Sequence, residues 1–142
     1  MTKMLQQSFE RMKTDYVDLY FLHGISSVKD IYAGTKEWAE KAKKDKKIRF
    51  FGFSTHRNME DCLLDAAKLG WIDGIMMTYN YRVMDSDKMK QAVDACQKAG
   101  IGLTAMKTQG KSPGFDFLKA ESETAKKLTD RLLQKGFTEH QA

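Results

Sequence analysis

The sequence predicts an α/β fold in which about four parallel strands alternate with helices. Dense apolar segments, rich in aromatic and β-branched residues, recur at intervals of about 25 to 30 residues, the length of one βα unit. Between these segments, apolar residues recur at helical spacing. Strands that are separated by helices run parallel, because the helix carries the chain back before the next strand begins.

Local patterns define each element. Strands are predicted where apolar residues form a nearly continuous run, as in a strand buried on both faces. Helices are predicted where apolar residues recur every three or four positions, and in one of them Glu37 is placed to pair with Lys41. Asn58 is a candidate cap for the third helix, and Asp85 or Ser86 begins the fourth. The predicted strands are 17–22, 48–53, 74–79 and 102–106, and the predicted helices are 5–12, 28–44, 59–69, 86–99 and 122–133.

The carboxy-terminal section departs from this alternation. Residues 111–114 are predicted to form a loop around the only proline, and residues 138–142 resemble the opening of a further helix with Thr138 as its cap. A length of 142 residues fits one domain with a substantial core. Residues 1–142 are therefore interpreted as a single domain.

Composition narrows the class of protein. Hydrophobic residues make up 42% of the chain and charged residues 30%, which is typical of globular proteins. No apolar run approaches the ~20 residues that a membrane helix needs, and the amino terminus lacks a signal-peptide pattern, so a cytoplasmic location without membrane association is expected. Much of the net charge of +5 comes from the lysines at 41–47. They are interpreted as a solvated helix end, and no nucleic-acid partner is expected, because no aromatic or arginine side chains are interleaved with them.

The two cysteines, Cys62 and Cys96, lie far apart and each falls within a helical pattern. Neither belongs to a Cys-x-x-Cys pair, so buried thiols in a reducing compartment are predicted. No metal site is predicted, and no cysteine cluster of this chain is suited to an iron–sulfur centre.

Polar residues follow the apolar strands. His23 ends the first strand, Ser54 and Thr55 end the second, and Asn80 follows the third. The carboxyl ends of parallel strands meet at one edge, where α/β folds place their chemistry, so a site is expected there. Four such strands form either an open sheet or half of an eight-stranded barrel, and length alone favours the open sheet, since a whole barrel typically needs ~250 residues.

Other residues near the strand ends receive simpler interpretations. His56 is interpreted as a surface loop residue, and Lys107 as a solvated amine that points toward the same rim. Tyr79 and Asn80 are interpreted as residues that pin the corner between strand and loop. None of these four is predicted to take part in chemistry.

Four motifs at the predicted strands stand in an order that resembles the fourth to seventh strands of the aldo/keto reductase family. The motifs at 46–56 and 105–108 are most similar to those of the branch whose members often carry a carboxy-terminal ferredoxin-like extension. The motifs are Leu-Gln-Gln-Ser-Phe-Glu-Arg-Met-Lys-Thr-Asp-Tyr-Val-Asp-Leu-Tyr-Phe-Leu-His at 5–23, Lys-Lys-Ile-Arg-Phe-Phe-Gly-Phe-Ser-Thr-His at 46–56, Tyr-Asn at 79–80 and Ala-Met-Lys-Thr at 105–108.

The resemblance implies a partial (β/α)8 barrel and hydride transfer between NADP or NAD and a small carbonyl substrate. His23 matches the family's catalytic histidine, which orients the carbonyl group. Ser54 matches the serine that bonds the nicotinamide carboxamide, and Thr55 stands where many members have asparagine. Met76 occupies the place of a common glutamine, and Met106 that of an aromatic residue that stacks on the nicotinamide; a methionine also lies favourably against a ring.

The family's catalytic aspartate, tyrosine and lysine belong to its first three strands and are not expected within residues 1–142. Two interpretations therefore stay open. In the first, the chain is part of an NAD(P)H-dependent oxidoreductase and is inactive alone. In the second, it is a non-catalytic half-barrel with a structural or self-associating role, because the open edges of a four-stranded sheet invite pairing.

Overall fold

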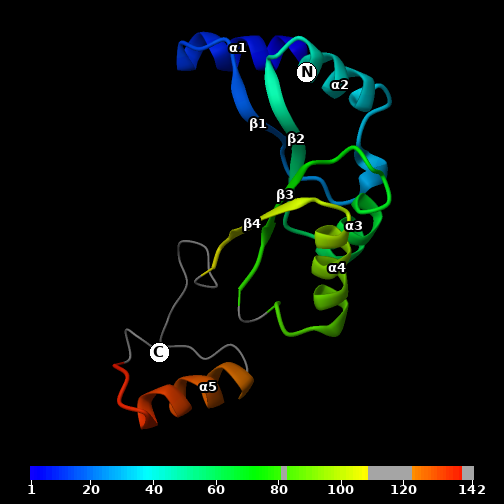
Figure 1. Cartoon of the computed structure of the whole chain (residues 1–142). Helices are drawn as coiled ribbons and strands as arrows, with labels where there is room; N and C mark the ends of the chain where they lie inside the picture. The colour runs from blue at the N-terminus through cyan, green and yellow to red at the C-terminus, as the bar shows by residue number, and fades with distance from the viewer. Residues whose placement is uncertain (81–82, 109–122, 139–142) are drawn as a thin grey trace. The chain divides into compact units, whose positions relative to one another are not determined.

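A computed structural model describes residues 1–80, 83–108 and 123–138 (Figure 1). They fall into two compact units, Met1–Gly110 and Lys111–Ala142, and each is described by itself. In its described residues the second unit holds the predicted last helix, α5 (Glu123–Gln134). The predicted loop at 111–114 and residues 139–142 lie outside the described residues, and the single domain over 1–142 stays a prediction. The elements of the first unit are α1 (Thr2–Met12), β1 (Val17–Leu22), η1 (Val28–Asp30), α2 (Thr35–Lys44), β2 (Ile48–Thr55), α3 (Met59–Ala66), β3 (Gly74–Thr78), α4 (Asp87–Lys98) and β4 (Gly102–Met106).

The four strands form one sheet in the order β1-β2-β3-β4, and every neighbouring pair is parallel. The predicted α/β architecture is therefore confirmed. Each strand pairs with the next one along the chain, as in successive βα units. This order brings the carboxyl ends of all four strands to one edge (Figure 1).

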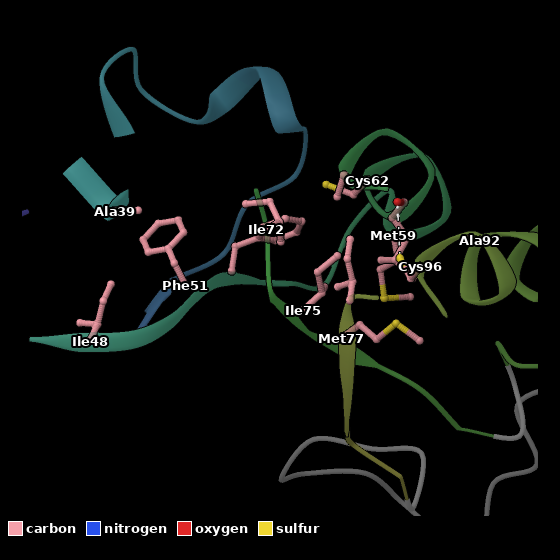
Figure 2. Close-up of a cluster of buried hydrophobic side chains, with 14 of the residues drawn as sticks. Ala39, Ile48, Phe51, Met59, Cys62, Ile72, Ile75, Met77, Ala92 and Cys96 are labelled. Carbon is pink, nitrogen blue, oxygen red and sulfur yellow. Dashed lines mark hydrogen bonds between the residues drawn. The ribbon is translucent and has the colours of Figure 1, made fainter. Parts of the chain in front are cut away.

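The core lies on one face of the sheet, where helices α1, α2, α3 and α4 contribute buried side chains; Figure 2 shows part of this cluster. Phe51 of β2 is fully buried, and its ring lies 6.1 Å from that of Trp38 and 5.7 Å from that of Trp71, measured between centroids. Further along the sheet, Ile75 and Met77 of β3 are buried on the same face. Burial of an aromatic side chain of this size contributes about 2–3 kcal/mol.

The opposite face of the sheet exposes apolar side chains. Leu19 and Phe50 are partners in the β1–β2 register and remain 41% and 39% exposed. Nearer the carboxyl edge, the Phe21 ring lies over Gly52 and Gly74, with Cε1 only 2.6 Å and 3.5 Å from where a Cβ on each glycine would stand. The absence of side chains at the two glycines makes room for this ring. In a closed barrel this face forms the interior.

The prediction of one helix over 28–44 is wrong at its start. The turn η1 is followed by extended backbone at Ile31, and Gly34 takes a left-handed conformation (φ 80°) that other residues adopt only with strain. These conformations end helical geometry, so α2 begins at Thr35. The predicted pairing of Glu37 with Lys41 is also wrong, because Lys41 Nζ lies 2.8 Å from Asp45 Oδ2.

The predicted helix caps have different outcomes. Ser86 is confirmed, since its Oγ accepts a 3.0 Å hydrogen bond from the Met89 N–H. Asn58 is wrong as a side-chain cap: its backbone is left-handed (φ 48°), and its amide donates to the Ser26 carbonyl, 3.4 Å away. The bounds of β1 and β4 are confirmed, β2 extends two residues further to Thr55, β3 ends one residue earlier at Thr78, and α3 ends at Ala66.

Candidate functional site

The carboxyl edge of the sheet gathers most of the predicted site residues. His23 directly follows β1, Ser54 lies near the end of β2, Met76 lies in the middle of β3 and Met106 ends β4. Ser54 is the register partner of Met76, and Met106 that of Thr78. Side chains two residues apart share a face of a strand, so these groups face the same side as Phe21 and Gly52.

Ser54 links the tips of β1 and β2. Its Oγ accepts a 3.0 Å hydrogen bond from the Gly24 N–H and lies 3.4 Å from His23 Nδ1. Because the hydroxyl already accepts one bond, its hydrogen is available for donation to Nδ1. In that arrangement the neutral His23 ring carries its own hydrogen on Nε2, where it can be donated to a bound group. The His23 side chain is exposed, so such a group can reach it.

Met76 places a thioether beside Ser54, its register partner, and Met106 places a second one on β4. Both side chains are half-buried, and the β3–β4 register sets Met76 opposite Thr104 and Met106 opposite Thr78. A half-buried thioether offers a polarisable apolar surface to a flat ring. The edge therefore combines hydrogen-bonding groups from β1 and β2 with an apolar surface from β3 and β4.

Thr55 lies apart from these four residues. It alternates with Ser54 along β2 and is fully buried on the helix-covered face. Its Oγ1 donates to the Arg57 carbonyl, 3.1 Å away. The structure thus places His23, Ser54 and the two methionines on one face of the sheet, where Ser54 lies next to His23 and Met76, and leaves Thr55 on the other face.

His56 contacts residues of the candidate site, although the sequence indicated only a surface loop residue. It is indeed exposed, but its Nδ1 lies 3.3 Å from Thr78 Oγ1 and its ring centroid lies 6.3 Å from that of His23, edge to face. The Lys107 side chain is exposed, as the sequence predicted. The residue adopts a left-handed backbone (φ 55°) directly after β4, and its carbonyl accepts a 3.0 Å hydrogen bond from the buried Asn80 amide.

Two basic residues, Lys107 and His23, act on the His56 imidazole. Its pKa is lowered from the ordinary value by partial burial first, then by Lys107 and His23. The ring therefore tends to be neutral near pH 7. The thiols elsewhere in the fold are inert by contrast: burial raises the pKa of Cys62, and that of Cys96 to about 11. Both cysteines are free and buried, as predicted.

Searches of the described residues reveal neither a metal centre nor a membrane span. In ranges 1–80, 83–108 and 123–138, no three His, Cys, Asp or Glu side chains gather as metal ligands would. None of the helices in those ranges is both long enough and apolar enough to cross a bilayer.

The model of the aldo/keto reductase family matches residues 1–137. The chain belongs to this family. Two curated relatives from Bacillus subtilis are an uncharacterized oxidoreductase, YqkF, which is 36% identical over 54% of this chain, and a glyoxal reductase, which is 33% identical over 70% of it. The resemblance seen in the strand-end motifs is thereby confirmed.

Solved aldo/keto reductases share the fold. An aldo/keto reductase from Brucella melitensis is 22% identical over 93% of this chain with a TM-score of 0.61. One from Bombyx mori, solved in complex with NADP, is 18% identical over 91% of this chain with a TM-score of 0.52. This chain spans 24% and 34% of the lengths of the two curated relatives, and 47% and 45% of the two solved chains. The sheet of this aldo/keto reductase chain therefore corresponds to part of their barrels.

Proposed function

We propose that this chain supplies one side of the active site of an NAD(P)H-dependent aldo/keto reductase. The observation that carries the proposal is the linked arrangement of His23 and Ser54 at the carboxyl edge, with Met76 and Met106 on the same face. The substrate is a small carbonyl compound. The reaction takes place in the cytoplasm, where nicotinamide cofactors are abundant.

The residues at the edge fit a reduced nicotinamide, which when bound supplies a hydride to the carbonyl carbon. The Ser54 hydroxyl is a suitable partner for a carboxamide, and the half-buried Met76 and Met106 offer an apolar surface for the ring. His23 donates a hydrogen bond from Nε2 to the carbonyl oxygen and holds it in place while negative charge develops there. Thr55 is not needed in this scheme, because its hydroxyl bonds the backbone of Arg57.

The proton for the carbonyl oxygen has a different source. In the family a tyrosine, tuned by a lysine and an aspartate on the first three strands, donates it. We therefore expect the chain to be inactive alone and active once those strands are supplied. Here "completed barrel" means residues 1–142 joined to the remaining strands of the glyoxal reductase relative.

The lysine-rich segment gives no support to a nucleic-acid role. Lys43 pairs with Asp73, and Lys41 pairs with Asp45. A lysine whose charge is neutralised by a carboxylate is less able to bind the phosphates of a nucleic acid. The segment also precedes β2, at the end of the sheet opposite to the candidate site.

The cofactor assignment is tested by titrating the completed barrel with NADPH. Ser54→Ala should weaken binding about tenfold, because it removes a hydrogen bond from a partly desolvated amide. Met106→Ala should weaken binding less, since it removes only dispersion contacts. Met4→Ala, on exposed α1, is the matched control and should leave affinity unchanged. Equal affinities for all four proteins would contradict the assignment.

The expected inactivity of the chain alone is tested separately. NADPH oxidation with a reactive aldehyde should not exceed background for residues 1–142 and should appear for the completed barrel. Turnover by the chain alone that His23→Ala abolishes would show that the additional strands are not required.

A self-associating half-barrel is the second candidate, and the exposed face favours it. Within the part of the chain that the structure describes, β1 and β4 each have a single neighbouring strand, so each presents a free edge. The face of the sheet between these edges exposes the apolar side chains of Leu19 and Phe50. Association of two copies would cover both features. Phe50→Ser should therefore shift the chain toward the monomer in sedimentation, while Leu69→Ser, an equally exposed apolar residue after α3, should not. A wild-type chain that stays monomeric at all concentrations would exclude this candidate.

A further inference from the structure

His56, Thr78 and Lys107 occupy the tips of three neighbouring strands, and His56 lies beside His23. His56 follows β2, Thr78 ends β3 and Lys107 follows β4. Thr78 Oγ1 lies 3.3 Å from His56 Nδ1, which fixes the ring and leaves Nε2 for another partner. The His56 ring stands edge to face against His23, with 6.3 Å between centroids. Any molecule that reaches His23 therefore lies next to His56.

The backbone of Lys107 is held in an uncommon conformation. A left-handed φ of 55° strains a residue that has a Cβ, and such strain persists only where surrounding contacts maintain it. Here the Asn80 amide binds the Lys107 carbonyl, and the Tyr79 N–H binds the preceding carbonyl of Met106 at 3.1 Å. These two hydrogen bonds between the ends of β3 and β4 thus fix the backbone of Lys107.

Charge at this edge is unbalanced. Among the described residues, the charged groups that act on the His56 imidazole are Lys107 and His23, and each lowers its pKa. By contrast, several lysines elsewhere in the first unit lie close to a carboxylate, for example Lys41 with Asp45, Lys88 with Asp61 and Lys98 with Asp94. An anion placed between His56 and Lys107 would relieve their repulsion.

We propose that His56, Thr78 and Lys107 form an anion-recognition site that binds a carboxylate carried by the carbonyl substrate. The inference rests on the proposed function, and it narrows the substrate class to short oxo acids. His23 holds the carbonyl oxygen, the adjacent His56 binds the carboxylate, and Lys107 at the tip of β4 supplies positive charge to it. Because the His23 and His56 rings are in contact, the site suits a substrate whose carbonyl and carboxylate groups are a few bonds apart.

Pyruvate and methyl pyruvate are the matched probes, because they share the ketone and differ in the charge of the second group. The sequence contains three histidines, so each ring signal can be followed by NMR in the chain itself. Pyruvate should shift the His56 and His23 signals and raise the pKa of His56, since an anion favours the protonated ring. Methyl pyruvate at the same ionic strength should shift His56 little. Equal affinity for the two probes would overturn the proposal.

Variants separate the anion site from general charge effects. Lys107→Gln should weaken pyruvate binding about fivefold and raise the pKa of His56 in the free protein, because a repelling charge is removed. Lys47→Gln, the same change at the amino end of β2, should do neither. Thr78→Val should free the His56 ring and weaken pyruvate binding, while Thr104→Val should not. Equal effects of Lys107→Gln and Lys47→Gln would show that only net charge matters.

The alternative source of an anion at this edge is the cofactor. Inorganic pyrophosphate is the probe for its phosphates, and stronger competition by pyrophosphate than by pyruvate at His56 would overturn the substrate assignment. NADPH affinity of the completed barrel, measured with Ser54→Ala, reports on the proposed function independently. A normal Ser54 effect without pyruvate recognition would therefore refute this inference alone.

Discussion

Replacing Gly52 with alanine should unfold the chain. A Cβ at this position would stand 1.8 Å from the Gly74 carbonyl oxygen and 2.6 Å from Phe21 Cε1, so both a neighbouring strand and a half-buried ring would have to move. Overpacking against backbone cannot be relieved by a rotamer change, and we expect a loss of at least about 3 kcal/mol in the free energy of unfolding. Urea denaturation followed by circular dichroism measures this loss.

Gly102→Ala is the matched control for that substitution. It makes the same chemical change in β4, but the nearest atom to the new Cβ is the Asp73 carbonyl oxygen at 3.6 Å, an ordinary contact. The free energy of unfolding should stay within about 1 kcal/mol of the wild type. Similar stabilities for the two variants would mean that β2 and β3 do not approach each other as described.

His23→Ala should reduce kcat/KM of the completed barrel by a factor of about 10²–10³. This is the usual effect of removing a hydrogen-bond donor from an oxygen that gains charge in the transition state. Because the side chain is exposed and contacts mainly Ser54 and His56, the fold should be unaffected. Steady-state kinetics with a reactive aldehyde, alongside urea denaturation, separates the two effects.

His23→Gln tests whether hydrogen bonding is the reason for that loss. Glutamine keeps an N–H donor, so its activity should lie between those of the wild type and His23→Ala. Activity of His23→Ala within threefold of the wild type would remove His23 from the reaction. A large loss of stability would instead assign it a structural role.

The strands were predictable because each is an apolar run between turn residues. The bounds of β1 and β4 were predicted residue for residue, and the parallel order follows from the helices between them. The start of α2 was not predictable from periodicity. Residues 28–44 keep an apolar pattern, but Gly34 takes a left-handed conformation that the pattern does not reveal. The backbone conformations of Ile31 and Gly34 therefore decided the boundary.

The site was predictable only in part. His23 and Ser54 stand at strand ends, so the sequence placed them at one edge, and their 3.4 Å contact agrees with that. Thr55 was grouped with Ser54 by resemblance, yet strand alternation turns it into the core. The contact of His56 with Thr78 depends on the β2–β3 register, which sequence alone does not supply. The sequence feature that pointed to His56 was the position of a histidine directly after a predicted strand.

The central claim, that the nicotinamide lies against the carboxyl edge of this sheet, is tested most directly with methionine methyl signals. The completed barrel would carry ¹³C-methyl methionine, with each signal assigned by a leucine substitution, and NADPH would be added. Met76 and Met106 should shift, while the exposed Met4 and Met12 on α1 should not. Unchanged Met76 and Met106 signals, or shifts confined to Met4 and Met12, would contradict this account.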